Sequence, residues 1–470
     1  MNIWGILNIN PTKNKDEIKK AYLNKLSVVH PEDDEEGFKL LRRSYEEALK
    51  EADKDEVIDE DNTPIGIWIK KVNEVYDKFS LRINEEAWKN LLNEDVCYGI
   101  DTKEDASEKL LEFLMDNFRF PQKIWILLNN YFEWTEQKEE LYEKFPYEFI
   151  DYVDNRIKYI DVLNYELFEN IDDNKNYDQW IESYYKIRRE LNERNLDEAK
   201  KSLDNIEQLN IFHPSLEVLK IRYFISNNDI ENARSISERL IEEYANEPDV
   251  MYSMAEVEWI EKNVNEAKLL YEKVLEILPE DYNSICGLAD CYLELDELDK
   301  AKDLYLNLMR RNSYDDYVRR KIAETNDKLI DQYKESHEEK SLSEKFNIAW
   351  CLYENYRYDE ILELSKEIDC DEENQSQYFD LMGRTYSSLE EYSKALNYFN
   401  MWCEKIDTRN SEERDNNRQL EYIYCEKARI LMKLEKYEEA IKICSNCLEI
   451  NNKNIGSLYI KSYSLNKLKK

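Results

Sequence analysis

The chain has 470 residues and a formal net charge of −37. So acidic a protein does not attract phosphate groups, which makes nucleic acid and anionic membrane surfaces unfavourable partners. No run approaches the roughly 18 apolar residues of a membrane span, and residues 1–9 lack the basic flank and long apolar stretch of a signal peptide. We therefore expect a soluble, cytoplasmic protein.

The composition favours an all-α fold. Glycine and proline are scarce, with seven and eight residues, while Glu, Lys, Leu and Tyr are abundant. The nine cysteines are scattered, and only Cys444 and Cys447 have the spacing of a Cys-x-x-Cys pair. Because both fall at packing positions of a predicted repeat helix, we interpret them as small core residues and expect no metal or cofactor.

The N-terminal region predicts two helices. The first spans about residues 16–29, with two acidic residues in its first turn, where they suit the helix dipole. Pro31 disfavours helix at His30 and turns the chain. The second helix begins near Gly37. The apolar stripes of the two helices are Ile18, Tyr22, Leu26 and Val29, then Phe38, Leu41, Tyr45, Ala48 and Leu49.

These stripes predict an antiparallel hairpin that displays His30, Pro31 and Glu32 on its connecting loop. The pattern resembles the J domain of DnaJ-type co-chaperones over residues 1–50. The matching segments are Leu7-Asn8-Ile9, Ile18-Lys19-Lys20-Ala21-Tyr22, Lys25-Leu26, His30-Pro31, Phe38 and Ser44-Tyr45-Glu46. The third residue of the family's tripeptide is Asp, where this chain has Glu32, and the loop is shorter than in typical members.

The resemblance implies a partner for this hairpin. In the family, basic residues of the first long helix contact an acidic face of a DnaK-type ATPase, and the tripeptide contacts the seam that couples hydrolysis to substrate closure. Lys19, Lys20 and Lys25 supply such a basic face. Residues 1–50 carry as many basic as acidic residues, which suits an electrostatically steered contact. The alternative is that the loop only connects two helices, with His30 an ordinary surface residue.

The middle of the chain predicts an aromatic-rich helical module without repeats. An acidic run, residues 51–62, indicates a linker or a fraying helix end. Asp101 or Thr102 is a candidate cap for a helix that extends to Phe118. Five of the nine tryptophans lie between residues 68 and 180. We interpret them as core residues, and a ligand groove is the alternative.

From about Tyr177 the chain repeats. Four alanines recur at an even spacing, and a similar sequence surrounds each of them: Ala199, Ala233, Ala267 and Ala301. The period and the small residue at the helix crossing resemble tetratricopeptide repeats, which predict a right-handed solenoid of helix pairs. The first-helix contact positions are Ile187, Ile221, Ala255 and Ala289.

A second block of repeats follows. Its second-helix positions are Ile361, Ala395 and Ala440, and its first-helix positions include Ala349 and Gly383. We expect one long helix over residues 315–335 and a loop insertion over residues 407–417. Residues 455–468 predict a final helix, a candidate cap of the stack.

The repeat family binds partner peptides on its concave surface. One of its uses is a clamp for a C-terminal carboxylate, built from Lys and Asn on first helices. We do not expect this clamp, because those positions hold Tyr252 and Glu256, Cys286 and Asp290, and Asp380 and Arg384. Arg188, Arg222, Arg384 and Arg429 share one first-helix position and are candidates for binding an acidic peptide. The alternative is that they are solvated arginines.

We do not expect an enzyme. The chain has three histidines and lacks a Gly-rich phosphate loop, a His-Glu-x-x-His motif and a Gly-x-Ser-x-Gly motif. The expected architecture is a J-type hairpin (1–56), a helical module (57–176) and two repeat blocks (177–335 and 336–470). The expected function is recruitment of a DnaK-type ATPase by the hairpin and of a client or partner protein by the repeats. The alternative is a scaffold whose hairpin does not stimulate ATP hydrolysis.

Overall fold

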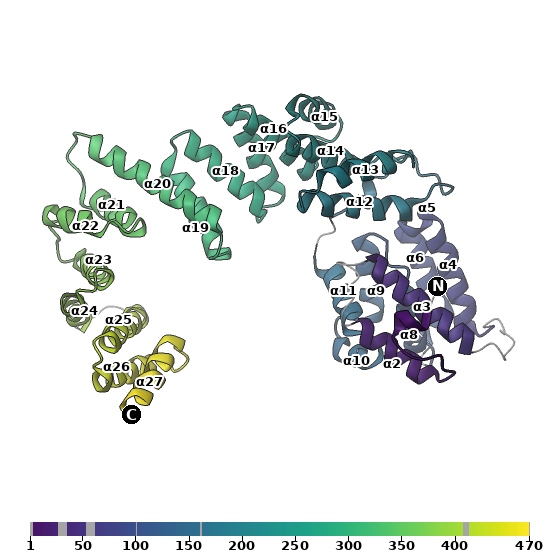
Figure 1. The fold of residues 1–470 in the computed structure, drawn as a ribbon, viewed down its shortest axis with the longest axis horizontal. Coiled ribbons are helices and arrows are strands. Elements are labelled where there is room, and N and C mark those ends of the chain that lie inside the picture. Colours follow the sequence, from purple (N-terminus) through teal and green to yellow (C-terminus); the bar gives the residue numbers. More distant parts are fainter. Residues whose placement is uncertain are drawn as a thin grey trace. The chain divides into compact units, whose positions relative to one another are not determined.

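The computed structural model describes residues 3–26, 35–52, 62–99, 101–159, 162–407 and 413–469, which form helices and no strands (Figure 1). The chain divides into two compact units, Met1–Val257 and Glu258–Lys470. The predicted all-α class is confirmed. Within the described ranges no helix combines the length and the apolar character needed to cross a membrane.

The N-terminal hairpin comprises α1 (Ile3–Leu7), α2 (Lys15–Leu26) and α3 (Glu35–Ala52). The backbone N–H of Glu17 donates to the Asn14 side chain at 3.3 Å and so helps to begin α2. Residues 27–34, which include His30, Pro31 and Glu32, lie outside the described part of the chain. The three helices enclose a small core of Ile3, Leu7, Ile18, Ala21, Tyr22, Leu41 and Ala48.

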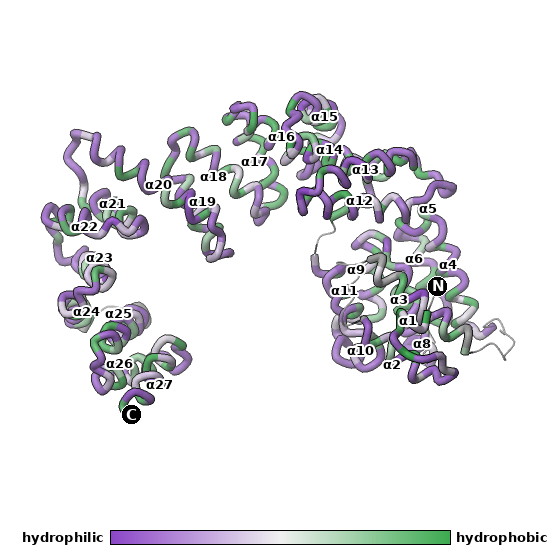
Figure 2. Tube along the Cα trace, in the orientation of Figure 1, coloured by the Kyte–Doolittle hydropathy of each residue, from purple (hydrophilic) through white to green (hydrophobic). Residues whose placement is uncertain are grey.

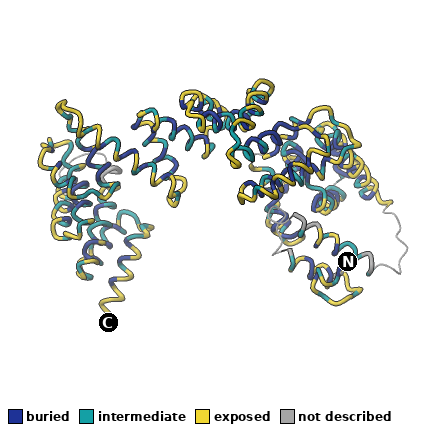
Figure 3. The backbone as a smooth tube through the Cα atoms, turned by 45° about the horizontal axis from the view of Figure 1, so that its top comes forward, coloured by how far each residue is buried: buried dark blue, intermediate teal, exposed yellow. Residues whose placement is uncertain are grey.

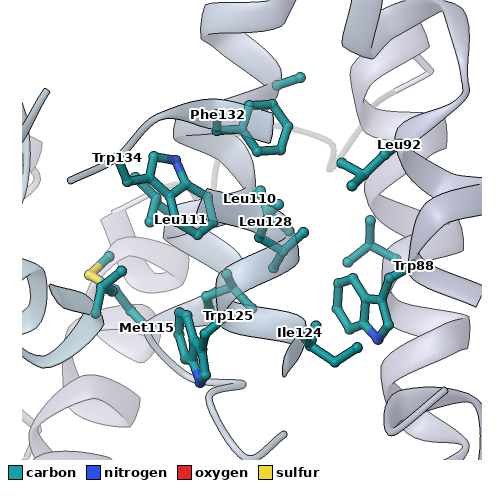
Figure 4. Close-up of a cluster of buried hydrophobic side chains, with 14 of the residues drawn as sticks. Trp88, Leu92, Leu110, Leu111, Met115, Ile124, Trp125, Leu128, Phe132 and Trp134 are labelled. Atoms are coloured by element: carbon teal, nitrogen blue, oxygen red, sulfur yellow. The ribbon is translucent and has the colours of Figure 1, made fainter. Parts of the chain in front are cut away.

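The middle module is built from eight short helices and one 3-10 turn. They are α4 (Pro64–Asp77), α5 (Phe79–Arg82), α6 (Glu85–Leu92), α7 (Asp95–Tyr98), α8 (Lys103–Leu114), α9 (Gln122–Phe132), α10 (Lys138–Lys144), α11 (Tyr147–Lys158) and η1 (Tyr165–Leu167). Figure 4 shows Trp88, Trp125 and Trp134 among aliphatic side chains of this core. All five tryptophans from residue 68 to residue 180 are buried, so their interpretation as core is confirmed.

Buried indole N–H groups need acceptors, and the module supplies several of them. Trp68 Nε1 donates to the Leu91 carbonyl oxygen at 2.9 Å, and Trp134 Nε1 donates to Ser107 Oγ at 2.8 Å. The expected cap of α8 is wrong in detail. Thr102 holds the N-cap position, but its hydroxyl donates to the Val96 carbonyl oxygen at 2.8 Å instead of accepting from the helix. The helix also ends at Leu114, before Phe118.

Two arginines of the middle module hold the first array helix, α12 (Tyr177–Asn192). The Arg82 guanidinium lies 4.0 Å from the Tyr76 ring centroid, and its Nη1 donates to Asp178 Oδ1 at 2.7 Å. Arg119 Nη1 donates to the Asp178 carbonyl oxygen at 2.7 Å. Since Arg82 and Arg119 are both buried, Asp178 provides acceptors for charged donors that have little access to water.

The array continues in unit 1 with three whole helices and the beginning of a fourth. They are α13 (Leu196–Glu207), α14 (Pro214–Ser226), α15 (Ile230–Glu243) and α16 (Pro248–Ile260), the last of which reaches unit 2. Along the trace, hydrophobic and hydrophilic residues alternate within most helices, as expected when each helix buries one stripe (Figure 2).

Unit 2 contains the remaining repeats. Its helices are α17 (Val264–Ile277), α18 (Tyr282–Glu294), α19 (Leu298–Arg311), α20 (Asp316–Glu335), α21 (Leu342–Glu354), α22 (Tyr358–Leu364), η2 (Ser365–Glu367), α23 (Gln375–Ser388), α24 (Tyr392–Asp407), α25 (Glu413–Lys433), α26 (Tyr437–Ile450) and α27 (Ile455–Leu468). The long helix predicted over residues 315–335 is confirmed as α20. The predicted loop insertion is partly wrong, because residues 413–417 belong to α25.

Small residues occupy the helix crossings, as the 34-residue period predicts. Ala199, Ala233, Ala267 and Ala301 are fully buried, and so is Ala440 in the second block. Gly287 shows how close the helices come: a Cβ atom added there would lie 2.4 Å from Cζ of Tyr271 on the preceding helix. Cys444 and Cys447 are also buried in helix packing, in agreement with their interpretation as core residues.

His213 caps α14 inside the core of the first repeat. Its Nδ1 accepts the backbone N–H of Ser215 at 3.1 Å, and its Nε2 lies 3.0 Å from the Asn164 carbonyl oxygen. The neutral ring with its hydrogen on Nε2 satisfies both contacts. The ring packs against Phe168 and Trp180. Burial lowers the pKa of His213 to about 4.

The low pKa of His213 predicts that the stability of the folded protein depends on pH. Because its pKa in the folded protein lies below the usual value, its stabilising contribution is complete above about pH 6.5 and is lost as pH falls toward 4. We expect about 2 kcal/mol of unfolding free energy to be lost between pH 7 and pH 5 through this residue. The free energy of unfolding, measured by urea denaturation, should depend less on pH in the His213→Asn variant. The asparagine side chain still offers an oxygen that can cap α14. His337→Asn, at an exposed site, should behave like the parent protein.

The repeat register predicts that Ala267→Glu is severely destabilising. Ala267 has 0 % exposure, so the substitution places an unpaired carboxylate in a tight crossing and should cost about 3–5 kcal/mol. Leu269→Glu is the matched control, because Leu269 lies on the same helix with 55 % of its surface exposed. Thermal melting and hydrogen exchange of α17 and α18 measure the difference. Equal melting of the two variants would contradict the assigned register.

Candidate functional site

The outer surface of α2 carries the predicted basic face. Lys19 and Lys20 are exposed, while their neighbours Ile18, Ala21 and Tyr22 are buried on the opposite side of the helix. Lys25 is partly buried in the last turn, where a positive charge suits the helix dipole. The structure thus brings the first two predicted lysines together at the surface of one helix. His30, Pro31 and Glu32, for which the sequence predicts a loop, lie outside the described ranges.

The sequence did not reveal the contact that attaches the hairpin to the middle module. Arg42 of α3 donates from Nε to Asp116 Oδ2 at 2.9 Å, across 74 residues of sequence. Tyr22 and Tyr45 stack with ring centroids 4.4 Å apart, and the guanidinium of Arg42 lies 5.6 and 5.3 Å from them. Phe118, two residues after Asp116, packs against the hairpin core.

The ion pair between Arg42 and Asp116 lies largely out of contact with water. The Arg42 side chain is largely buried. The pKa of Asp116 is raised to about 7, because burial, helped by a hydrogen bond with Glu46, outweighs the opposing effect of Arg42. Desolvated charges of this kind contribute little net stability but are costly to leave unpaired. We conclude that the contact fixes the orientation of the hairpin on the module.

Three of the four candidate groove arginines have a polar partner in the structure. In unit 1, Arg222 donates to Asn192 Oδ1 at 2.9 Å, and it opposes the effect of burial, which raises the pKa of Glu256. Arg188, on α12, is partly buried. In unit 2, Arg429 is exposed and pairs with Glu426 at 2.6 Å.

Arg384 has the most ordered surroundings of the four. Its Nε donates to Asp380 Oδ1 at 2.7 Å, and its guanidinium lies 5.4 Å from the Trp350 ring centroid and 4.8 Å from that of Tyr422. Burial raises the pKa of Asp380, and Arg384 lowers it. Ala349 and Gly383 hold equivalent first-helix positions in successive repeats, so Trp350 and Arg384, which follow them, are equivalent too. The repeat register could therefore have predicted that Trp350 lies next to Arg384. Arg222, Arg384 and Arg429 therefore each have a polar partner within their own unit.

The hairpin contact predicts that Arg42→Met loosens the docking of α3. Removing one partner from a fully buried pair costs about 3–5 kcal/mol, and the partial exposure of Asp116 reduces this to about 2 kcal/mol. Native-state hydrogen exchange in α3 should become correspondingly faster. Arg43→Met is the control, because Arg43 is exposed and pairs with Glu47 one turn away on the same helix. Equal exchange in both variants would show that Arg42 does not secure the hairpin.

Comparisons with known proteins identify three segments. Residues 66–160 match the model of the DjlB/C second domain. Residues 258–323 and 422–454 match models of the tetratricopeptide repeat. No curated protein matches the chain.

Solved structures share the helical-repeat arrangement at low similarity. PilF of Pseudomonas aeruginosa is 11 % identical over 61 % of this chain and 98 % of its own, with a TM-score of 0.28. YrrB, described as having an unusual peptide-binding site, is 14 % identical over 48 % of this chain and 97 % of its own, with a TM-score of 0.23. The TPR2AB domain of yeast Sti1, solved as a pHSP90 complex, is 14 % identical over 53 % of this chain and 98 % of its own, with a TM-score of 0.24. It is the family models that identify tetratricopeptide repeats in this chain, together with a segment similar to the DjlB/C second domain.

Proposed function

We propose that this protein is a cytoplasmic J-type co-chaperone and adaptor, and not an enzyme. Its hairpin recruits a DnaK-type ATPase, and its repeats bind a client or partner protein. The observation that carries this proposal is the arrangement of the hairpin. Its basic residues Lys19 and Lys20 are exposed on α2, while α3 is attached to a module similar to the DjlB/C second domain. That module follows the hairpin in the chain, in agreement with its description as a second domain.

The electrostatics support an acidic face as the hairpin's partner. Lys19 and Lys20 are neighbours on one turn, so one acidic surface can contact both of them. Exposed charges of this kind raise the rate of encounter and fix the approach. Lys25 adds a third positive charge nearer to the loop. His30, Pro31 and Glu32 would then contact the ATPase beside this basic face.

The repeats offer concave positions for a client. Arg188 and Arg222 in unit 1, and Arg384 and Arg429 in unit 2, are our candidates for contacts with an acidic segment. Of these, Arg384 is the best prepared, because two aromatic rings and Asp380 hold its guanidinium in place. Trp, Tyr and Arg are also the residues that dominate binding energy at protein interfaces.

A second candidate function is a scaffold whose hairpin does not stimulate ATP hydrolysis. Glu32 favours it, because glutamate carries the carboxylate one methylene further from the backbone than the family's aspartate and has more side-chain entropy to lose. The two functions share the repeats and differ only in the hairpin. A measurement of ATP hydrolysis therefore distinguishes them.

The test is single-turnover hydrolysis by DnaK-type ATPases of the same organism in the presence of the full chain. We expect stimulation by the parent protein, its loss in His30→Gln and an increase in Glu32→Asp. Substitution of Lys19 and Lys20 by glutamine should weaken binding, and the loss should be larger at low salt because exposed charges are screened less there. Arg43→Gln, which changes an exposed positive charge on α3, is the matched control.

The outcomes separate the two functions. Failure of the parent to stimulate any of these ATPases would favour the scaffold. Stimulation that persists in His30→Gln would show that the tripeptide is not the active element. Circular dichroism of each variant should match that of the parent, since Lys19, Lys20 and Arg43 are exposed on their helices and the sequence predicts a loop at His30 and Glu32.

A further inference from the structure

Unit 1 contains a cavity of about 400 Å³. Three segments line it: the loop that precedes α12, the loop between α13 and α14, and the C-terminal end of α15. Figure 3 shows the connections between the repeat helices drawn largely as exposed. The α13–α14 loop departs from this pattern, because Ile211 is buried next to the exposed Phe212. The volume lies within the range of ligand pockets, about 300–1,000 Å³.

Aromatic rings form one wall of this cavity. The Phe212 side chain has 44 % exposure, and its ring centroid lies 6.2 Å from that of Tyr244, with 30° between the ring planes. Tyr177 and Ile211 are buried and line the cavity as well. An exposed ring beside a second ring offers a ligand its negative faces, which attract cations and flat apolar groups.

Two carboxylates lie at the same cavity. The hydroxyl of Tyr244 donates to Glu169 Oε1 at 2.6 Å, across 75 residues of sequence. This bond holds Glu169 at the cavity and leaves its second oxygen for a ligand. Glu243, which precedes Tyr244, also lines the cavity. Within the part of the chain that the structure describes, neither carboxylate forms an ion pair.

The cavity also contains a lysine, which is already engaged. The ammonium of Lys175 donates to the carbonyl oxygen of Asn210 and so connects the loop before α12 with the α13–α14 loop. Glu169 and Glu243 outnumber this lysine, so the lining residues carry a net negative charge. A ligand that completes the site therefore brings positive charge and hydrogen-bond donors.

The aromatic wall and the carboxylates together fit a guanidinium group. A guanidinium is planar, stacks on aromatic rings and can donate two parallel hydrogen bonds to one carboxylate. We propose that this cavity binds an arginine side chain from a basic segment of a partner protein. The guanidinium stacks against Phe212 and donates to Glu169 and Glu243. The proposal is independent of the hairpin and of the groove arginines, so it can fail without affecting either of them.

Two other ligands fit the cavity less well. A lysine side chain carries its charge on a compact, strongly hydrated ammonium, which does not stack on a ring as a guanidinium does. A phosphate group would find Lys175 as the cation among the lining residues and would be repelled by the two carboxylates.

The probe for the test is a capped pentapeptide, Gly-Ala-Arg-Ala-Gly. Its control has citrulline in place of arginine, which keeps the shape of the side chain and removes the charge. A third peptide has lysine at the same position. Saturation-transfer NMR titrations with the full chain should show that the arginine peptide binds about tenfold tighter than the citrulline peptide, the ratio that corresponds to one charge-assisted hydrogen bond. The lysine peptide should bind more weakly than the arginine peptide.

Variants of the chain locate the binding site. Glu169→Gln combined with Glu243→Gln should weaken binding of the arginine peptide about tenfold and leave binding of the citrulline peptide unchanged. The amide that replaces the carboxylate of Glu169 can still accept from Tyr244, so the loop keeps this contact. Glu242→Gln is the matched control, because Glu242 is exposed beside Glu243 and lies outside the lining.

A second variant tests the aromatic wall. Phe212→Ala should weaken the arginine peptide about threefold, as expected for a cation–π contact at an exposed site. Tyr98→Ala, at a residue of the middle module with 61 % exposure, should leave binding unchanged.

Several results would overturn the proposal. They are equal binding of the arginine and citrulline peptides, no saturation transfer to the arginine peptide, and binding that the double glutamine variant retains in full. A lysine peptide that binds as tightly as the arginine peptide would overturn the choice of arginine. Binding of inorganic phosphate that is lost in Lys175→Gln would assign the cavity to an anion.

Discussion

The close crossing of paired helices is the constraint on which the repeat array depends. Two helices approach this closely only where one presents a small side chain, and Ala199, Ala233, Ala267 and Ala301 meet that requirement at a fixed period. The consequence at Gly287 is direct, since even one added carbon would collide with the Tyr271 ring. The register that these small residues set decides which side chains of each repeat face the neighbouring helix.

Features that depend on local period could be predicted from the sequence, and those that depend on distant contacts could not. The alanines, the buried tryptophans and the long helix α20 were all predicted, because each leaves a pattern within one or two turns of helix or one repeat. The end of α8 and the start of α25 were missed. At Thr102, a distant carbonyl oxygen of Val96 takes the hydroxyl, and a short-range capping rule does not anticipate that competition.

The same distinction applies to the candidate sites. Lys19 and Lys20 were placed on the exposed face because helical period alone decides it. The contact of Arg42 was missed because its partner Asp116 belongs to another module, 74 residues further along the chain. No pattern in the sequence around Arg42 indicates this partner. Arg384 was assigned to the groove by register, but its contact with the Tyr422 ring, 38 residues further along the chain, emerged only from the packing of adjacent repeats. The sequence thus indicated where these side chains lie and not what holds them.

Net charge and local charge act on different scales in this molecule. The chain carries −37 overall, yet α2 is locally basic and is proposed to meet an acidic partner. At physiological salt, charges separated by more than about 8 Å are largely screened. The nearest lysines therefore decide the sign of a contact. At low salt the acidic remainder of the chain is felt as well and opposes an acidic partner. For this reason the difference between a lysine variant and the parent at one salt concentration reports the local contact, whereas the parent's own salt dependence mixes attraction and repulsion.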